Sequence, residues 1–212
     1  MARSTAAGQL DDRSAGVTSG GVDEATENRA AVRQIASGVA VLTVGTGPAM
    51  HGVTVSSLTA VSRDPLLIGL CLHRRSQFLS LLKTHRSFAV SVLDAAQAEP
   101  AKWFSNPDRP RGRAQFDRVR WQPDRISGAP LIVGALAWLS ARLVRVVDAG
   151  DHELLLAEVT GGSAADGQPL LNHGGRLHEV TTMIPIPPAP TRHADEENNR
   201  TAGRRTGRAE QL

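Results

Sequence analysis

Short runs of β-branched and aliphatic residues, bounded by Gly, Pro, Asp or Ser, dominate the middle of the chain. Runs of this length and composition are typical of β-strands. We expect strands at residues 39–46, 52–61, 66–72, 88–93, 135–147 and 154–160. Gly45, Gly47 and Pro48 lie between the first two runs, and this turn chemistry predicts a hairpin there.

Helical periodicity is confined to a few segments. We expect helices over residues 24–36, 77–84 and 95–104. In the second of these, Phe78, Leu81 and Leu82 share one face. Pro100 is expected to interrupt or bend the third, because proline lacks the N–H group that a helix interior needs. A doubly wound parallel sheet needs a helix in nearly every crossover, so the shortage of helices favours a mainly β fold, an antiparallel barrel.

Both ends of the chain differ in composition from the middle. The N-terminal residues are small and polar without apolar periodicity, and residues 1–28 are predicted to be a disordered or partly helical tail. Residues 184–212 are rich in proline and then charged, which predicts a second disordered tail. The folded domain is therefore expected at residues 29–183.

The chain has 212 residues, of which 41% are hydrophobic, enough to build one domain around its own core. No run approaches the roughly 18 apolar residues of a membrane-spanning helix, and the N-terminal segment lacks the apolar stretch of a secretory signal. We therefore expect a cytoplasmic protein with no membrane partner. Cys71 is the only cysteine, which excludes an intramolecular disulfide and a thiolate zinc cluster within one chain.

The sequence pI of about 9.9 overstates the basic character of the chain. The formal net charge is only +3; Lys83 and Lys102 are the only lysines and there is no tyrosine, so almost nothing titrates between neutrality and about pH 10. Aromatic residues make up 3% of the chain, which leaves few rings for stacking on bases. Both observations disfavour nucleic acid as a partner.

Residues 51–62 carry the first candidate site. Alternation puts Val53 and Val55 on one face of the strand and Thr54 and Ser56 on the other. Gly52 lets a ligand approach the backbone, and hydroxyls both donate and accept hydrogen bonds, so this face suits a ligand edge lined with carbonyl and imino groups. The alternative is an edge strand that shows its Thr and Ser side chains to water.

A second candidate site lies where residues 71–76 lead into the helix predicted at 77–84. Ser76 stands at the N-cap position, so the loop brings Arg74 and Arg75 to a helix N-terminus, where free N–H groups and the helix dipole favour an anion. The pattern predicts either a phosphate site or an ordinary capped helix with two solvated arginines. The arginines of residues 109–113 leave a similar choice, between a clamp for a diphosphate and a soluble loop.

Other groups give weaker signals. Asp151 precedes His152 in a segment rich in turn residues, and a second segment with histidines covers residues 170–178. The histidine spacings match no zinc motif, so no metal site is predicted. Cys71 ends an apolar run and is interpreted as a small buried hydrophobe rather than a nucleophile.

Several segments, in their order and spacing, resemble the flavin reductase family with the FMN-binding split β-barrel. They are SGVAVLTV, HGVTVSSLTAVSRDPLLIGLCL, RRSQFLSLL, SFAVSVL, FDRVRW, GAPLIVGALAWLSARLVRVVDAGDHELLLAEV and PLLNHGGRLH, which span roughly residues 29 to 180. The resemblance implies a mainly β, antiparallel Greek-key split β-barrel with a few short flanking helices. It also implies a homodimeric reductase that uses NADH or NADPH to reduce FMN or FAD and supplies reduced flavin to a flavin-dependent monooxygenase.

The resemblance also assigns residues to the two substrates. The flavin is expected to contact two segments, Met50, His51, Gly52, Val53, Thr54, Ser56 and Ser57 in the first, and Cys71, Leu72, His73, Arg75 and Ser76 in the second. The nicotinamide side is expected to comprise His152, as the catalytic residue that orients the nicotinamide nucleotide, and His173, Gly174, Gly175 and Arg176.

Two alternative functions stay open. One is a flavin carrier or sensor that does not turn over NAD(P)H, which is favoured by Leu177 because relatives often carry an aromatic residue there. The other is a related barrel that uses a different cofactor.

Overall fold

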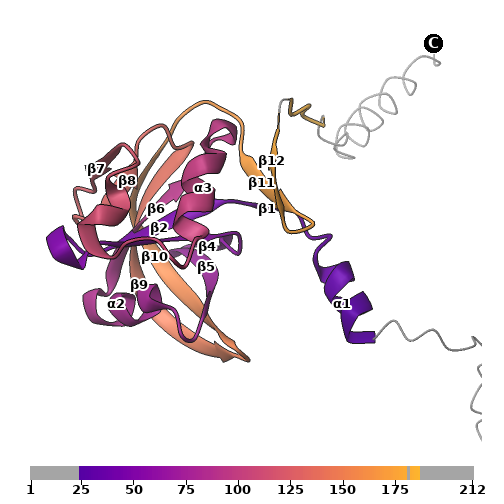
Figure 1. The fold of residues 1–212 in the computed structure, drawn as a ribbon, viewed down its shortest axis with the longest axis horizontal. Helices are drawn as coiled ribbons and strands as arrows, with labels where there is room; N and C mark the ends of the chain where they lie inside the picture. Colours follow the sequence, from indigo (N-terminus) through magenta and orange to yellow (C-terminus); the bar gives the residue numbers. More distant parts are fainter. Residues whose placement is uncertain (1–23, 181, 187–212) are drawn as a thin grey trace, which may run out of the picture. The chain divides into compact units, whose positions relative to one another are not determined.

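A seven-stranded antiparallel sheet forms the centre of the computed structural model, which describes residues 24–180 and 182–186 (Figure 1). The strand order is β3-β2-β6-β9-β10-β5-β4. These strands are β2 (Ala40–Val44), β3 (His51–Val55), β4 (Thr59–Arg63), β5 (Leu66–His73), β6 (Ser87–Val92), β9 (Ala137–Ala149) and β10 (His152–Ala164). Two smaller antiparallel sheets are built from β1 (Ser37–Gly38), β11 (Leu170–His173) and β12 (Arg176–Glu179), and from β7 (Trp121–Pro123) and β8 (Pro130–Ile132). The mainly antiparallel β fold is confirmed.

Short helices precede or connect these strands in the described residues. The α-helices are α1 (Glu24–Val32), α2 (Gln77–His85) and α3 (Ala98–Ser105). Single 3₁₀ turns form η1 (Gly47–Ala49), η2 (Ala95–Gln97) and η3 (Gly112–Phe116). The predicted hairpin is also present, since η1 joins β2 to its antiparallel partner β3.

The main sheet curls so that its two ends approach each other. The chain passes from β3 at one end of the sheet to β4 at the other through residues 56–58. Within that connection the Ser57 hydroxyl donates to the carbonyl of Cys71 at 3.1 Å and accepts from the N–H of Cys71 at 3.0 Å. Because Cys71 belongs to β5, one side chain joins the β3 end to the β5 end and makes a partly closed barrel.

The strand β2 is buried along its whole length and separates two hydrophobic clusters. Leu42 and Val44 belong to the first cluster, to which α2 contributes Phe78. Val41 belongs to the second, to which α3 contributes Phe104. A strand buried on both faces needs a nearly continuous apolar run, which explains why this segment reads VAVLTV rather than alternating.

Two segments differ from the sequence-based prediction. The strand expected at residues 52–61 is two strands, because the chain turns where Ser57 bonds to β5 instead of extending the ladder. The helix expected at residues 24–36 ends at Val32. The helix expected at residues 95–104 is divided into η2 and α3, which agrees with the interruption expected near Pro100. Pro100 itself lies in the first turn of α3, where its missing N–H has no partner within the helix. The residues before α3 form η2, which Asp94 caps.

The ends of the chain are described only in part. Of the predicted N-terminal tail, residues 1–23 lie outside the described residues, whereas Glu24–Val32 forms α1 and buries no side chain. Residues 181–212 form a separate unit. Only residues 182–186 of that unit are described, and they form neither helix nor strand.

The close packing of α3 on β3 predicts that a side chain at Gly52 destabilises the fold. A Cβ atom there would lie 2.6 Å from Cε1 and 2.7 Å from Cδ1 of the buried Phe104. We expect Gly52→Ala to lower the free energy of unfolding by about 1–3 kcal/mol in urea denaturation, because overpacking strains the core. Gly38→Ala is the control, since a Cβ there meets no atom within 4 Å. An equal loss at both positions would contradict the prediction.

Candidate functional site

A groove of about 360 Å³ lies between β3 with its following loop on one side and the end of β5 on the other. This site groove is lined by Val53, Thr54, Val55, Ser56, Ser57, Cys71, Leu72, His73, Ser76 and His152. All of these except Val55 were assigned to a substrate from the sequence. A larger groove of about 650 Å³, lined by Asp124, Trp138 and Gly161 among others, contains none of the assigned residues.

One wall of the site groove is the outer edge of β3. Among the described strands, it pairs only with β2. On its other edge the Gly52 N–H donates to Oε1 of Gln115 at 3.0 Å, while the Gly52 carbonyl accepts from Nη2 of Arg109. Backbone groups of alternate residues point to the same edge of a strand, so those of Thr54 also face outward, beside the groove. The wall therefore presents main-chain donors and acceptors.

The side chain of Thr54 contributes to the fold. Its hydroxyl donates to the carbonyl of Ala101 in α3 at 2.7 Å. The polar face predicted for this strand is thus partly covered by α3, and the alternative of a strand edge open to water is wrong at this residue. What stays beside the groove is the backbone of Thr54 together with Ser56 and Ser57.

The N-terminus of α2 forms a second wall. Ser76 is its N-cap, as predicted, but the side chain makes no capping hydrogen bond, so the first-turn N–H groups keep their capacity for an anion. The two arginines expected here diverge. Arg74 pairs with Asp148 on β9, while the backbone N–H of Arg75 donates to Nδ1 of His73 at 3.1 Å.

His152 begins β10 and closes the groove opposite β3. Its Nδ1 lies 2.7 Å from Oδ1 of Asp151, and its ring meets that of His73 edge-on, with 5.4 Å between the ring centroids. The hydrogen bond with His152, and after it the charge interaction with His152, lower the pKa of Asp151. This carboxylate holds the imidazole in one orientation, while 42% of the His152 side chain stays exposed to a ligand.

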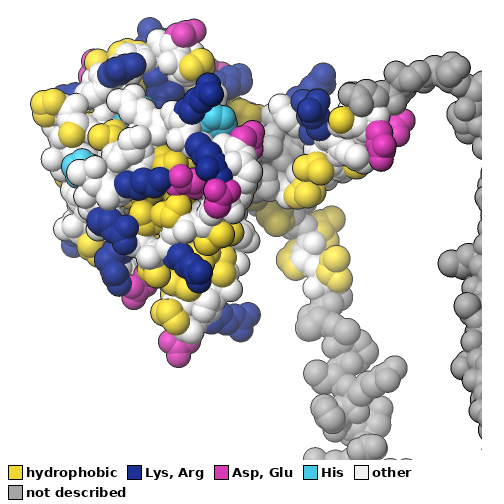
Figure 2. Space-filling model, turned by 90° about the horizontal axis from the view of Figure 1, so that it is seen from below, with side chains coloured by type: hydrophobic (Ala, Val, Ile, Leu, Met, Phe, Trp, Pro, Cys, Tyr) yellow, Lys and Arg dark blue, Asp and Glu magenta, His cyan; other side chains and the backbone are white. Residues whose placement is uncertain are grey.

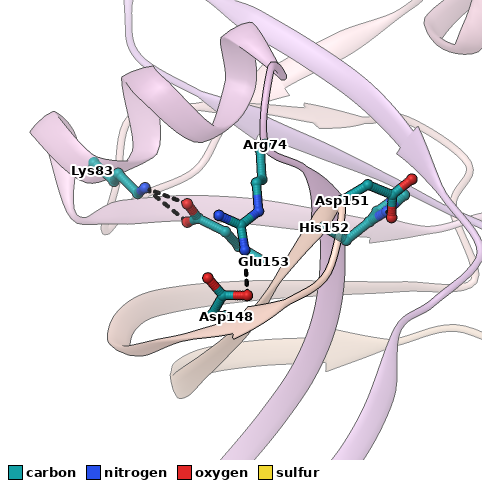
Figure 3. Close-up of polar contacts among 6 residues, drawn as sticks. All are labelled: Arg74, Lys83, Asp148, Asp151, His152 and Glu153. Carbon is teal, nitrogen blue, oxygen red and sulfur yellow. Dashed lines mark hydrogen bonds and ion pairs between the residues drawn. The ribbon is translucent and has the colours of Figure 1, made fainter.

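Two ion pairs fasten the hairpin that carries His152 (Figure 3). Nζ of Lys83 on α2 lies 2.9 Å from Oε1 and 2.7 Å from Oε2 of Glu153. The second pair joins Arg74 to Asp148. In Figure 3 both pairs lie to one side of Asp151 and His152. They therefore hold the hairpin of β9 and β10 against α2 and the loop before it without engaging the imidazole.

His51 lies behind the groove rather than in it. The side chain is buried, with Nδ1 at 3.2 Å from Nε2 of Gln115 and Nε2 at 3.4 Å from Nη2 of Arg109. Burial, and then the positive charges of Arg109 and Arg111, lower the pKa of His51 to about 4. The imidazole is therefore neutral at pH 7 and packs as part of the core.

Other assigned residues also lie outside the groove lining. Met50 and Gly52 pack under α3 with Phe104. The side chain of Arg75 is not part of the lining. His173, Gly174, Gly175 and Arg176 form the exposed turn between β11 and β12. Their place on the nicotinamide side stays a prediction.

Two residues at the site were not found from the sequence. Asn172 donates from Nδ2 to Oγ of Ser56 at 3.4 Å and so connects β11 to the groove, and Gln115 contacts β3 from a distant loop. Cys71 is only partly buried and lines the groove, so its interpretation as a buried hydrophobe is wrong.

The described residues contain neither a cluster of metal ligands nor a helix that could span a membrane. Among residues 24–180 and 182–186, no three His, Cys, Asp or Glu side chains gather closely enough to hold a metal ion. In the same part of the chain, no helix has both the length and the apolar character needed to cross a membrane.

Comparisons with known proteins identify the family of this chain. The family model of the flavin reductase like domain matches residues 32–181, and the chain belongs to this family. It is 44% identical over 155 residues to an NADPH-flavin oxidoreductase of Streptomyces viridifaciens, covering 73% of this chain and 80% of that protein. It is 41% identical over 144 residues to an NADH-dependent FAD reductase of Streptomyces globisporus, covering 66% and 78%.

A solved structure shows the same fold. The flavin reductase component BorF of a bacterial two-component tryptophan halogenase has a TM-score of 0.70 and 37% sequence identity to this chain, with 76% of this chain and all of BorF covered.

The buried imidazole predicts a specific pH dependence of stability. The pKa of His51 is about 4 in the folded chain against about 6.5 when unfolded, so the unfolded state binds the extra proton first as the pH falls. We expect the free energy of unfolding to drop by about 3 kcal/mol between pH 6.5 and pH 4, measured by urea denaturation. His51→Gln should flatten this part of the profile, and parallel profiles for both proteins would refute the assignment.

Proposed function

We propose that this chain is an NAD(P)H-dependent flavin reductase that transfers hydride to FMN or FAD and supplies reduced flavin to a partner monooxygenase. The observation that carries the proposal is the site groove itself. One groove in a member of the flavin reductase family is surrounded by a strand edge, a helix N-terminus that has no side-chain capping hydrogen bond, and a histidine held by a carboxylate.

The groove residues fit the chemistry of a flavin. The outward backbone groups of Thr54, with the hydroxyl of Ser56, match the alternating carbonyl and imino groups at the edge of an isoalloxazine ring. The N-terminus of α2 at Ser76 suits the flavin phosphate, because its N–H groups and dipole favour an anion. These elements would hold the flavin along β3 with its phosphate at α2.

The nicotinamide nucleotide is assigned to the side of the groove formed by His152. When both nucleotides are bound, the nicotinamide supplies a hydride from C4 and the flavin receives it at N5. Asp151 keeps the His152 ring oriented, so we assign His152 the task of positioning the nicotinamide. Backbone N–H groups near Thr54 stabilise negative charge at the flavin edge, and no side-chain acid is needed.

The alternative of a flavin carrier without turnover finds no support at the residue that suggested it. Leu177 packs against the second hydrophobic cluster, with Phe104 and Phe116 among its members, and is not part of the groove lining. The lack of an aromatic ring at this position therefore leaves the groove unchanged.

A homodimer is part of the proposal because an apolar strip borders the site. A Cβ on Gly69 would touch both Val61 and Leu156, so these side chains share one face of the sheet, where Val61 is 50% exposed. The strip continues through Leu154. This residue lies opposite Cys71 in the pairing of β10 with β5, and Cys71 lines the groove. Hydrophobic side chains bordered by charged ones also gather on the face drawn in Figure 2. A second copy over the strip would lie next to the site.

The remaining partners follow from the chemistry. Reduced flavin has to reach an acceptor, so we propose a flavin-dependent monooxygenase component as the receiving partner. We also propose the cytoplasm as the location. BorF, which belongs to a two-component halogenase, supports an arrangement of this kind.

The proposed positioning role of His152 can be tested by turnover. We expect the purified chain to oxidise NADH or NADPH, followed at the nicotinamide absorbance band, with a rate that saturates as FMN or FAD is added. His152→Ala should raise KM for the nicotinamide nucleotide at least fivefold and leave the flavin Kd within twofold. His85→Ala, at the exposed end of α2, is the matched control. A folded wild-type protein that binds flavin without oxidising either nucleotide would overturn the proposed function.

The proposed dimer depends on the apolar strip at Leu156. A carboxylate at Leu156 would be buried without a partner in an apolar interface. We expect the wild type to sediment as a dimer and Leu156→Glu as a monomer, in analytical ultracentrifugation. Ile126→Glu, at an exposed residue beside the larger groove, should stay dimeric. A monomeric wild type at micromolar concentration would contradict this part of the proposal.

A further inference from the structure

We propose that Gln115, together with Arg109, is a positioning residue for the flavin, because these two side chains decide where the outer edge of β3 becomes available to a ligand. The inference rests on the proposed function and concerns residues that do not line the site groove. They act on the flavin through β3.

The amide of Gln115 occupies the place of a neighbouring strand. The residue is fully buried, and its Oε1 accepts from the N–H of Gly52 at 3.0 Å. Its Nε2 donates to the carbonyl of Met50 at 3.2 Å and to that of Gly112 at 3.1 Å. A side-chain amide offers the same donor and acceptor as a peptide group. The edge of β3 is therefore paired through Gly52 although no strand lies beside it.

Arg109 also binds Gly52, and we call Gln115 and Arg109 together the clamp. Its Nη2 donates to the Gly52 carbonyl, its Nε donates to Oε1 of Gln115 at 3.3 Å, and its Nη1 donates to the Asn106 carbonyl at 2.6 Å. The indole Nε1 of Trp103 donates to the Gln115 carbonyl at 2.7 Å and ties the same loop to α3. Both backbone groups of Gly52 thus have partners held by α3 and its following loop.

The clamp ends where the groove begins. The next outward backbone groups after Gly52 belong to Thr54, which lines the groove. Without the clamp, the N–H and carbonyl of Gly52 could also bind the edge of the ligand that binds Thr54, because glycine has no side chain to block them. A flavin edge bound to β3 is therefore confined to residues 54–57, and the clamp sets its register along the strand.

The experiment compares matched variants of the full chain. Gln115→Leu removes every hydrogen bond of the amide, whereas Gln115→Glu keeps the acceptor for Gly52 and loses both donors. Ser91→Ala is the control, because it removes a buried hydrogen bond from the Ile132 N–H, 2.9 Å long, away from the groove. For each protein we would measure the Kd for FMN by flavin fluorescence, the visible spectrum of bound FMN, and Tm.

We expect Gln115→Leu to raise the Kd for FMN at least tenfold and to shift the spectrum of the bound flavin, with Gln115→Glu between it and the wild type. Ser91→Ala should lower Tm and leave the Kd within twofold. If Gln115→Leu does not fold, Gln115→Glu and Arg109→Lys provide the same comparison.

Two results would overturn the inference. One is an unchanged Kd and spectrum in the Gln115 variants, and the other is an equal rise in Kd for Ser91→Ala, which would make the clamp merely structural. Failure of the proposed function is distinct from these. A wild type that binds FMN without oxidising NAD(P)H removes the reductase activity but leaves the comparison of Kd values valid. A wild type that binds neither FMN nor FAD overturns both.

Discussion

The paired hydrogen bonds between the Ser57 hydroxyl and the backbone of Cys71 are the contact on which the site depends. They join two strands that stand near opposite ends of the main sheet and so prevent the sheet from opening flat. The groove lies between β3 and β5, at the place where these bonds hold the two strands together. A hydroxyl is well suited to this position, since it can donate to a carbonyl and accept from an N–H of the same residue.

The sequence predicted the fold well because burial leaves a local signature. Apolar runs bounded by turn residues identified the strands, and Ser76 before an amphipathic segment identified the start of α2. Ser57 illustrates the limit. It continues the polar alternation of a strand, and nothing nearby in the sequence shows that its partner is Cys71, so one long strand was expected where the chain turns.

The site was predicted in part, for a related physical reason. The residues of the groove lie in segments whose order and spacing carry the family resemblance. The contacts behind the groove lie far apart in sequence, as between Gly52 and Gln115, which are 63 residues apart. From the sequence, the arginines of residues 109–113 are interpreted as ligand groups or solvated charges. In the structure, Arg109 is half-buried and donates hydrogen bonds to backbone carbonyls. Only the folded chain shows that a cation and a neutral histidine share that space.

The two walls of the groove are held by different kinds of interaction. The outer edge of β3 is bonded to the side chains of Gln115 and Arg109. The hairpin of β9 and β10 that carries His152 pairs with β5, and the charged pairs Lys83–Glu153 and Arg74–Asp148, which are partly exposed to solvent, also tie it to α2 and the loop before that helix. Exposed pairs of this kind each contribute up to about 1 kcal/mol and weaken as salt screens them. A change in ionic strength therefore acts on the contacts behind His152 more than on the hydrogen bonds that shape the edge of β3.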